Sequence, residues 1–319
     1  SWLCWALHAA RRSWRVSNCI VMTCWNRLIG WSNPRACRLR RHFIGKTVIS
    51  EHHPQAIGVY EGGVSRREIR DTVENADALL CLGAWMSDIN LGVYTARLDD
   101  RRMILANSGR LKISHHVYEQ VWIGDVITGL IEHMPTGGLK SPGYTPMSDL
   151  FGTEFTVKPD QAVTMARVMQ RLNGFIGKDT TVIAETGDSI FAAADLVLHR
   201  DVGLLGQAFY LSIGFALPAT LGDAFADPGR RPVALIGDGA FQMTAQELST
   251  ICRHKQNLII LLMNNDGYTA ERIIHEGPYN DIQPWAYHRL PEVFGGGWGA
   301  RVSSMPPWNA HARQPTARP

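Results

Sequence analysis

The chain has 319 residues, 45% of them apolar, which is enough for about two globular domains with a core each. Charged or turn residues interrupt every apolar run, so no segment reaches the ~18 uninterrupted apolar residues of a membrane span, and we expect no membrane insertion. The net charge of +3 is unevenly distributed, because both ends are basic and the middle part, 43–299, has a charge of −8. That middle part lacks a clustered basic face, so we expect no nucleic-acid binding.

The two ends differ in composition from the middle. Residues 1–42 hold eight Arg, four of the six Cys and five of the ten Trp, but no acid, no Lys and no sustained periodicity. A transit peptide is also Arg-rich, but so many Trp and Cys suit it poorly. Residues 300–319 are rich in Pro and again lack acids. We leave both ends unassigned and expect that they are translated out of frame, which translating the source DNA in its other two frames would test.

The cysteines show no metal-binding or redox pattern. No two of the six have C-x-x-C spacing, and Cys81 and Cys252 stand alone in apolar surroundings. This favours reduced, buried thiols and a cytoplasmic protein.

From about Phe43, short apolar runs alternate with amphipathic stretches, the pattern of βα units around a parallel sheet. The pattern predicts a first α/β domain over 43–134 with a helix at 65–75. A turn-rich segment, 135–157, is the expected linker. The expected strands of this domain are 56–60, 78–82 and 103–106.

A second α/β domain is expected over 158–299, so the predicted fold is two doubly wound parallel-sheet domains with irregular ends. Short apolar runs predict its strands, and longer apolar or amphipathic stretches predict its helices. The expected helices are 158–172, 208–226 and 244–254, and the expected strands are 181–184, 232–236 and 258–263.

Polar loops follow two of these strands directly, at Gly237-Asp238-Gly239 and at Asn264-Asn265. In a parallel sheet both loops open on the same edge, where ligands bind. The glycines let the backbone approach a phosphate, and the following helix presents free N–H groups to it. Since Asp238 would repel a bare phosphate, a cation must lie between them, and carboxylate and amide oxygens suit Mg²⁺ or Ca²⁺. The loops therefore predict a metal and diphosphate site.

Taken alone, Gly-Asp-Gly is a plain turn and Asn-Asn-Asp-Gly a capping loop. The conjunction is more specific, because 24 residues that form a helix and a strand separate the two motifs. In this the sequence resembles the thiamine diphosphate (ThDP)-dependent enzyme superfamily, whose fingerprint is GDG followed by NN at about this spacing. The resemblance implies ThDP and Mg²⁺ as cofactors. It also implies three metal ligands: the side chains of Asp238 and Asn265 and the backbone carbonyl of Gly267.

Within that superfamily the sequence is most similar to pyruvate and indolepyruvate decarboxylases, from about Gly45 to Gly299. The resemblance makes 43–134 their central domain and 158–299 a truncated diphosphate-binding domain. Ile213 falls where a bulky aliphatic residue supports the thiazolium, and Leu211 falls where the family often has Gly. The segments that carry the similarity are 45–46, 51–60, 185–189, 212–215, 264–271 and 274–275. The implied cofactor-binding residues are Thr186, Asp188, Leu211, Ser212, Ile213, Gly237, Asp238, Gly239, Ala240, Phe241, Asn265, Gly267 and Tyr268.

Glu271 distinguishes reaction classes within the superfamily. An acid at the last position of NNxGYxxE is typical of simple decarboxylases and argues against a carboligase of the acetolactate-synthase kind. The carbon that loses carbon dioxide must gain a proton, and a nearby carboxyl group can supply it. The alternative is an exposed carboxylate at a helix start, near Arg272. The resemblance thus implies a lyase that decarboxylates indolepyruvate, phenylpyruvate or pyruvate, with Ile190, Ala270 and Ile274 as candidate pocket residues.

The family's pyrimidine-binding domain has no counterpart in the sequence, so we expect a fragment with little or no activity alone. A noncatalytic ThDP-binding remnant is therefore a further alternative. The family's catalytic His-His pair lies in that domain, whereas His52-His53 matches the central domain and receives no catalytic role. His115, His116 and His275 are expected to be structural. The resemblance implies a dimer or tetramer for the complete enzyme. An NAD-binding domain is disfavoured, because no GxGxxG follows a strand.

Overall fold

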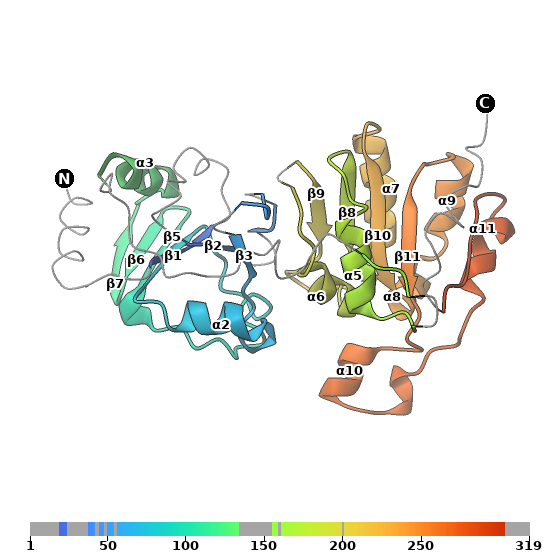
Figure 1. The fold of residues 1–319 in the computed structure, drawn as a ribbon, viewed down its shortest axis with the longest axis horizontal. Helices are drawn as coiled ribbons and strands as arrows, with labels where there is room; N and C mark the ends of the chain where they lie inside the picture. The colour runs from blue at the N-terminus through green and yellow to red at the C-terminus, as the bar shows by residue number, and fades with distance from the viewer. Residues whose placement is uncertain are drawn as a thin grey trace. The chain divides into compact units, whose positions relative to one another are not determined.

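A computed structural model describes residues 19–23, 38–41, 45–47, 50–53, 56–133, 155–158, 161–199 and 201–303 (Figure 1). The chain forms two compact units. The first comprises Ser1–Leu150, Val197–Gly203 and Ala208–Tyr210, and the second comprises Phe151–Leu196, Leu204–Gln207 and Leu211–Pro319. Residue 134, the expected end of the first domain, lies outside the described residues. So do most of the expected linker, 135–157, and nearly all of the tail 300–319.

The first unit is built on a seven-stranded sheet of order β3-β2-β1-β4-β5-β6-β7. Strands β1 to β5 pair in parallel, and β6 and β7 extend the sheet as an antiparallel hairpin. Its strands are β1 (Cys19–Thr23), β2 (Arg38–Arg41), β3 (Ala56–Val59), β4 (Ala78–Leu82), β5 (Met103–Asn107), β6 (Arg110–Ile113) and β7 (His116–Glu119). Its helices are η3 (Gly62–Val64), α2 (Arg67–Glu74), η4 (Asp100–Arg102) and α3 (Ile123–His133).

Strands β1 and β2 lie within residues 1–42, which the sequence left outside any domain. β1 pairs with β4 over five residues and with β2 over three. A central parallel strand needs only a short apolar run, and Cys19–Thr23 is such a run inside an otherwise irregular composition. A run of this length carries too little periodicity to be recognised among so many Arg and Trp.

The core of the first unit forms where α2 covers the sheet. Ile69 and Val73, one turn apart on α2, are buried against Leu79 and Cys81 of β4. The hydroxyl of Tyr60, a fully buried residue, donates a hydrogen bond to Glu74 Oε1 at 3.0 Å. Burial of Cys81 as a free thiol agrees with the expectation for this residue.

A buried ion pair ties the first unit to its later segment, Val197–Gly203. Lys46 Nζ lies 2.6 Å from Glu51 Oε1, and both side chains are almost fully buried. The other carboxylate oxygen, Glu51 Oε2, accepts a hydrogen bond from the backbone N–H of Leu198 at 2.8 Å. The backbone N–H of Glu51 in turn donates to the Leu198 carbonyl at 2.9 Å. One carboxylate therefore joins parts of the chain that are far apart in sequence.

The second unit has a four-stranded sheet of order β11-β10-β8-β9, in which β10 pairs in parallel with both β11 and β8. The α/β class and the parallel sheets expected from the sequence are thus confirmed. Its strands are β8 (Thr180–Ala184), β9 (Gly203–Gly206), β10 (Arg231–Gly237) and β11 (Ile259–Met263). Its helices are α5 (Met165–Asn173), α6 (Asp188–Ala193), α7 (Ala216–Ala226), α8 (Asp238–Thr244), α9 (Glu247–Arg253), α10 (Thr269–Ile274), η5 (Pro278–Asn280), η6 (Tyr287–Arg289) and α11 (Leu290–Val293).

Three expected helices of the second unit have different starts in the structure. The expected helix 158–172 begins only at Met165, where the Thr164 side chain caps it by accepting the N–H of Arg167 at 3.4 Å. The expected helix 208–226 begins only at Ala216, because Leu211 and Gly214 adopt positive φ angles of 58° and 88° that end any helix before them. The expected helix 244–254 is α9, and a separate helix, α8, precedes it and begins at Asp238 immediately after β10.

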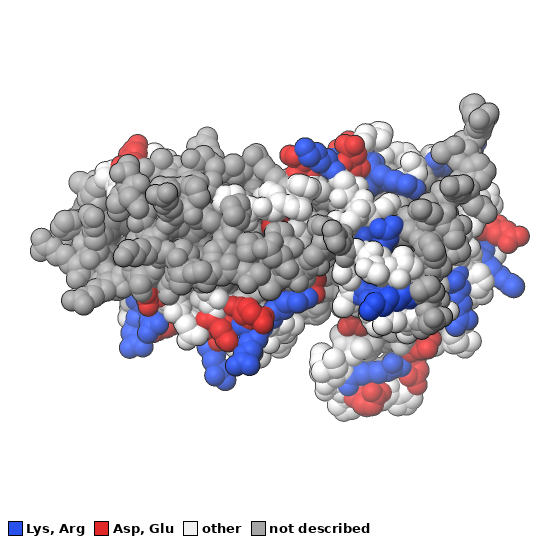
Figure 2. Space-filling view, viewed as in Figure 1, with Lys and Arg blue, Asp and Glu red and all other residues white. Residues whose placement is uncertain are grey.

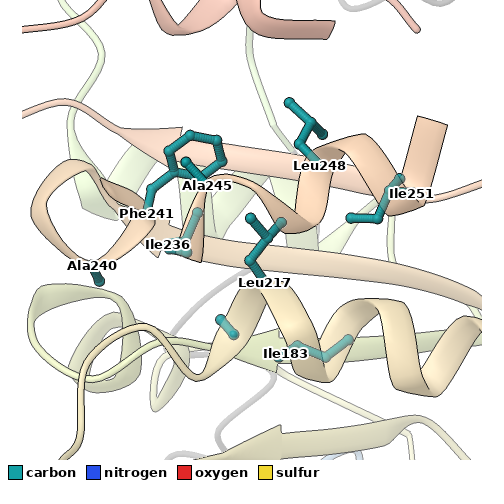
Figure 3. Packing of buried hydrophobic residues seen from close by; sticks show 9 residues of the cluster. Ile183, Leu217, Ile236, Ala240, Phe241, Ala245, Leu248 and Ile251 are labelled. Carbon is teal, nitrogen blue, oxygen red and sulfur yellow. The ribbon is translucent and has the colours of Figure 1, made fainter. Parts of the chain in front are cut away.

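The core of the second unit surrounds β10. Figure 3 shows Leu217 of α7 and Leu248 of α9 gathered with Ile236 of β10 and Phe241 of α8. These side chains are buried, and they fix the start of α8 against the end of β10. The hydrophobic core therefore sets the position of the Gly237-Asp238-Gly239 turn.

Where Figure 2 shows residues that the structure describes, basic and acidic side chains are interspersed. On α2, Arg67 Nε lies 3.4 Å from Asp71 Oδ2. Within the described ranges, no helix has both the length and the apolar character needed to cross a bilayer.

Candidate functional site

The two polar loops predicted from the sequence meet at one edge of the second sheet. Gly237 and Met263 are register partners at the ends of β10 and β11. Asp238 Oδ2 accepts a hydrogen bond from the backbone N–H of Asp266 at 2.8 Å, and Oδ1 accepts one from Gly239 at 2.8 Å. The structure confirms that the loops lie side by side.

Asp238 is a buried carboxylate, with only 1% of the residue exposed. Burial raises the pKa of its carboxyl group, and hydrogen bonds from the backbone N–H groups of Gly239 and Asp266 act in the opposite direction. In the described part of the chain, no Lys, Arg or His side chain pairs with it. A buried carboxylate without a countercharge is costly, and a bound cation would relieve that cost.

Asn265 presents an unused oxygen at the same edge. Its Nδ2 donates to Asp188 Oδ2 at 3.1 Å and to Thr269 Oγ1 at 2.6 Å. These bonds occupy the amide nitrogen, and no donor among the described residues bonds to Oδ1. Asp238 and Asn265 therefore offer hard oxygen atoms from adjacent loops, which is the donor set that Mg²⁺ prefers.

The loop that follows Asn265 has a backbone that only glycine fits at position 267. Gly267 has a φ of 139°, and a Cβ there would lie 2.3 Å from the carbonyl oxygen of Asn280 and 2.7 Å from Arg272 Nη2. Asp266, directly before it, also has a positive φ, of 60°. The expected metal-ligating carbonyl of Gly267 accepts the backbone N–H of Thr269 at 3.1 Å and no other donor among the described residues, which leaves a second lone pair for a ligand.

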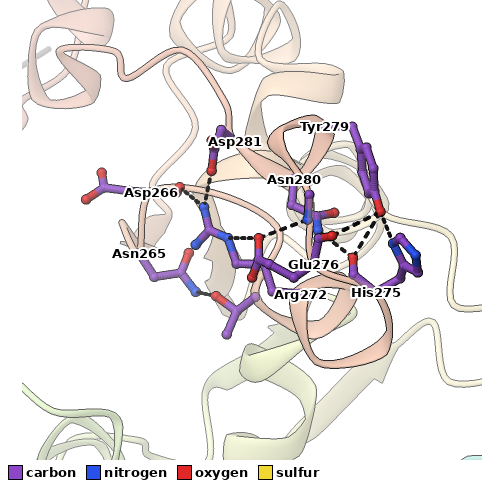
Figure 4. A network of polar contacts seen from close by, with 10 residues as sticks. Asn265, Asp266, Arg272, His275, Glu276, Tyr279, Asn280 and Asp281 are labelled. Atoms are coloured by element: carbon purple, nitrogen blue, oxygen red, sulfur yellow. Dashed lines mark hydrogen bonds and ion pairs between the residues drawn. The ribbon is translucent and has the colours of Figure 1, made fainter.

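A polar network holds this loop against the segment that follows α10 (Figure 4). Arg272 Nη2 donates to the Asp266 carbonyl at 2.8 Å and to Asp281 Oδ1 at 2.7 Å. The backbone N–H of Tyr268 donates to the Asn280 carbonyl at 2.9 Å. None of these contacts was predicted from the sequence, because an Arg in a helix that looks exposed gives no indication of which backbone or side-chain groups it will contact.

Glu185 is a second buried carboxylate at this edge, fully inaccessible at 0% exposure. Its Oε1 accepts the backbone N–H of Thr186 at 3.0 Å, and its Oε2 accepts that of Ala216, the first residue of α7, at 2.8 Å. Burial raises its pKa, against the effect of these N–H groups. Glu185 thus connects the loop after β8 with the loop before α7. In the sequence, Glu185 belongs to the segment 185–189 that carries the family similarity, but no pattern there assigns it a role.

The loop before α7 is fixed from both sides. Thr244 Oγ1 of α8 donates to the Gly214 carbonyl at 3.1 Å, and Thr186 Oγ1 donates to the Gln207 carbonyl at 3.1 Å. Leu211 has a left-handed backbone, with a φ of 58°, at a cost of about 1–2 kcal/mol for a side chain. Ser212 and Ile213 are exposed at the surface of the loop.

Two glycines leave room at the strand ends. A Cβ added at Gly187 or Gly237 would meet no atom within 4 Å, so a ligand can approach their backbone. At Gly239 a Cβ would lie 2.5 Å from the ring of Tyr268. Ala240 and Phe241 turn their side chains into the core, so only their backbone can face a ligand.

Comparisons with known proteins fit this geometry. Residues 185–312 match the family described as "Thiamine pyrophosphate enzyme, C-terminal TPP binding domain". The second unit therefore contains a domain that matches the ThDP-dependent enzymes. "Alpha-keto-acid decarboxylase" of Mycobacterium tuberculosis is 34% identical over 253 residues, which are 79% of this chain and 45% of the relative. "Pyruvate decarboxylase 2" of Pisum sativum is 36% identical over 255 residues, 80% of this chain and 63% of the relative. The chain thus spans about half the length of the mycobacterial relatives.

Glu271 lies exposed in the first turn of α10, which stands away from the sheet (Figure 1). The Arg272 guanidinium contacts Asp266 and Asp281, so it does not pair with Glu271. Ile274 is also exposed, as a pocket residue must be. Ile190 is buried at 1% exposure, so the expectation that it lines a pocket is wrong; its helix α6 turns it into the core.

His52 and His275, two of the described histidines, contact other aromatic side chains. His52 stacks on His199 in the first unit, with ring centroids 3.9 Å apart. Burial lowers the pKa of His52, and the charge of His199 adds to the decrease. His275 contacts the hydroxyl of Tyr279, four residues along the chain.

Proposed function

We propose that this chain supplies the diphosphate- and metal-binding half of a ThDP-dependent 2-oxo-acid decarboxylase. The observation that carries the proposal is Asp238, a buried carboxylate without a basic partner, in contact with the loop that presents Asn265. Mg²⁺ would be held by Asp238, by Asn265 Oδ1 and by the Gly267 carbonyl, because these are the oxygen atoms that the two loops offer.

The diphosphate would lie along the backbone at the start of α8. The open space at Gly187 and Gly237 supports this placement, as do the N–H groups at the helix start. Since Ala240 and Phe241 are core residues, they would contribute through their backbone. The remaining proposed cofactor contacts are Thr186, Asp188, Leu211, Ser212, Ile213, Gly239 and Tyr268.

When bound, ThDP supplies the thiazolium that accepts the 2-oxo acid and stabilises the electrons released as carbon dioxide leaves. Ile213 is exposed in this chain and would support the thiazolium. Glu271 would hold the proton that the reacting carbon gains. Its exposed position in this chain suits that role once another surface covers it and excludes water.

The proposed substrate is indolepyruvate, phenylpyruvate or pyruvate, converted to the aldehyde and carbon dioxide. The names of the relatives support a 2-oxo acid, and the Glu271 position favours decarboxylation over an acetolactate-synthase-like carboligation. We propose two domains that follow the two compact units, so that 43–134 is extended by β1, β2 and the segments 197–203 and 208–210, which 158–299 loses. We also propose a cytoplasmic location, and a dimer or tetramer for the complete enzyme. For the 319-residue polypeptide alone we propose ThDP binding with little or no turnover.

Calorimetric titration of ThDP with and without Mg²⁺ tests the proposal. We expect Mg²⁺-dependent binding by the wild type and its loss in Asp238→Ala, because the main anionic ligand is removed. The matched control is Asp227→Ala, an acid in the same unit that pairs with Arg230 on the surface. A wild type that binds no ThDP, or an Asp238→Ala protein that binds as the wild type does, would overturn the proposal.

A second experiment adds a pyrimidine-binding domain from a relative and measures aldehyde formation from each 2-oxo acid. Turnover that falls in Glu271→Gln while ThDP binding stays unchanged supports decarboxylation. ThDP binding without turnover in any combination supports the noncatalytic alternative.

A further inference from the structure

We propose that Arg272, acting with Asp281, is a positioning residue that fixes the backbone of the metal-binding loop. This inference rests on the proposed function, because it concerns the loop between the proposed ligands Asn265 and Gly267. Arg272 reaches neither of these ligand atoms through a hydrogen bond. It acts on the peptide group between them.

The loop needs such a restraint because its backbone is unfavourable. Asp266 and Gly267 both have positive φ angles, 60° and 139°, and Asp266 carries a side chain in a region that side chains disfavour. Residues in this region persist only when their surroundings hold them. The conformation decides where the Asn265 side chain and the Gly267 carbonyl point.

Asp266 is held from two sides by side chains of different elements. Its N–H donates to Asp238 Oδ2 at 2.8 Å, and its carbonyl accepts from Arg272 Nη2 at 2.8 Å. Asp238 is itself a proposed metal ligand. Arg272, by contrast, has no proposed role in binding the metal or the cofactor. Without Arg272 the Asp266 carbonyl loses this partner, and rotation of the peptide group becomes easier.

Asp281 keeps the guanidinium in place. Its Oδ1 lies 2.7 Å from Arg272 Nη2, and the neighbouring Asn280 carbonyl accepts the N–H of Tyr268 at 2.9 Å. The segment from Tyr268 to Asp281 therefore closes on itself at the loop (Figure 4). Arg272 also lies beside Glu271 on α10, so one clamp sets both the metal loop and the helix that carries the proposed proton donor.

The test uses Arg272→Gln, Arg272→Lys and a matched control. Arg230→Gln removes an ion pair of similar exposure in the same unit: the side chains are 32% and 53% exposed for Arg230 and Asp227, against 27% and 67% for Arg272 and Asp281. The first readout is amide hydrogen exchange of the cofactor-free protein. We expect exchange at Asp266 and Tyr268 to become at least about tenfold faster in Arg272→Gln, with β10 unchanged.

The second readout is the Mg²⁺ concentration that gives half-maximal ThDP binding. We expect it to rise about 10- to 100-fold in Arg272→Gln, the range for residues that orient metal ligands, with partial recovery in Arg272→Lys. Saturating Mg²⁺ should restore binding, because the ligand atoms themselves remain. A merely structural role would change thermal stability without moving the Mg²⁺ dependence.

Unchanged exchange at Asp266 and Tyr268, or an equal increase in Arg230→Gln, overturns the proposal. If Arg272→Gln fails to fold, Asp281→Asn decides, since it weakens the clamp and leaves Arg272 in place: faster exchange at the same two amides supports the proposal, and unchanged exchange overturns it. A wild type that binds no ThDP defeats the proposed function, while the exchange measurement still decides whether Arg272 positions the loop.

Discussion

Gly214 gives a quantitative test of how the loop before α7 is held. Its φ of 88° disfavours any side chain, and a Cβ there would lie 2.9 Å from the Cβ of Met243 and 3.3 Å from Cγ2 of Thr244. We expect Gly214→Ala to cost about 1–2 kcal/mol for the backbone conformation and about 1–3 kcal/mol for overpacking against α8. The free energy of unfolding should therefore fall by about 2–5 kcal/mol.

The matched control is Gly222→Ala, in the interior of α7. A Cβ at Gly222 would meet no atom within 4 Å, and its helical backbone accepts a side chain freely. Because Ala favours a helix interior over Gly, we expect Gly222→Ala to stabilise the protein by about 0.5–1 kcal/mol. The same chemical change should thus have opposite effects at two positions of one unit.

Urea denaturation followed by circular dichroism measures both variants, with the m-value compared so that a change in midpoint reflects stability. The reasoning is refuted by a Gly214→Ala midpoint equal to that of the wild type, or by two shifts in the same direction.

Three further predictions concern buried groups. Leu217→Ala should lower the unfolding free energy by about 2–5 kcal/mol in urea denaturation, because Leu217 is buried in the core around β10. Lys46→Met should cost about 3–5 kcal/mol in the same assay, since it leaves Glu51 buried and without its countercharge; no loss would contradict the role of the pair. Asp223 has a pKa raised mainly by burial, and its Oδ2 has no hydrogen-bond partner among the described residues. The folded protein therefore favours the neutral carboxyl group more than the unfolded chain does, and this contribution to stability is lost as pH rises through the raised pKa. Asp223→Asn should raise the Tm most at neutral pH and least at the most acidic pH at which the protein stays folded; an equal gain at every pH would refute the titration.

The strands of the parallel sheets were predictable because buried parallel strands are continuous apolar runs. The expected strand 78–82 coincides with β4, and those at β8, β10 and β11 agree within one residue at each end. The start of α7 was not predictable in the same way. Leu211 adopts a left-handed backbone, which a Leu in the sequence does not predict. Residues 208–215 are also as apolar as the helix that follows, so composition does not mark where the helix begins.

At the site, the sequence predicted the two loops because glycines and hard oxygen ligands follow strands directly, and the contact between Asp238 and Asp266 confirms that the loops meet. The roles of individual residues in cofactor binding remain predictions. The Glu185 bridge and the Arg272 clamp were not predictable, since each depends on a side chain reaching a backbone group that only the folded chain brings near.

The attachment of Val197–Gly203 to the first unit limits how this protein can be divided. Leu198 satisfies the Glu51 carboxylate, yet it follows β8 and α6 of the second unit in the chain. A cut at residue 150 would therefore leave a buried acid without its amide donor in one piece and an unpaired peptide group in the other. A domain swap between relatives should therefore exchange residues 197–203 together with the first unit. The modules of this chain are defined by their contacts and not by a single boundary in the sequence.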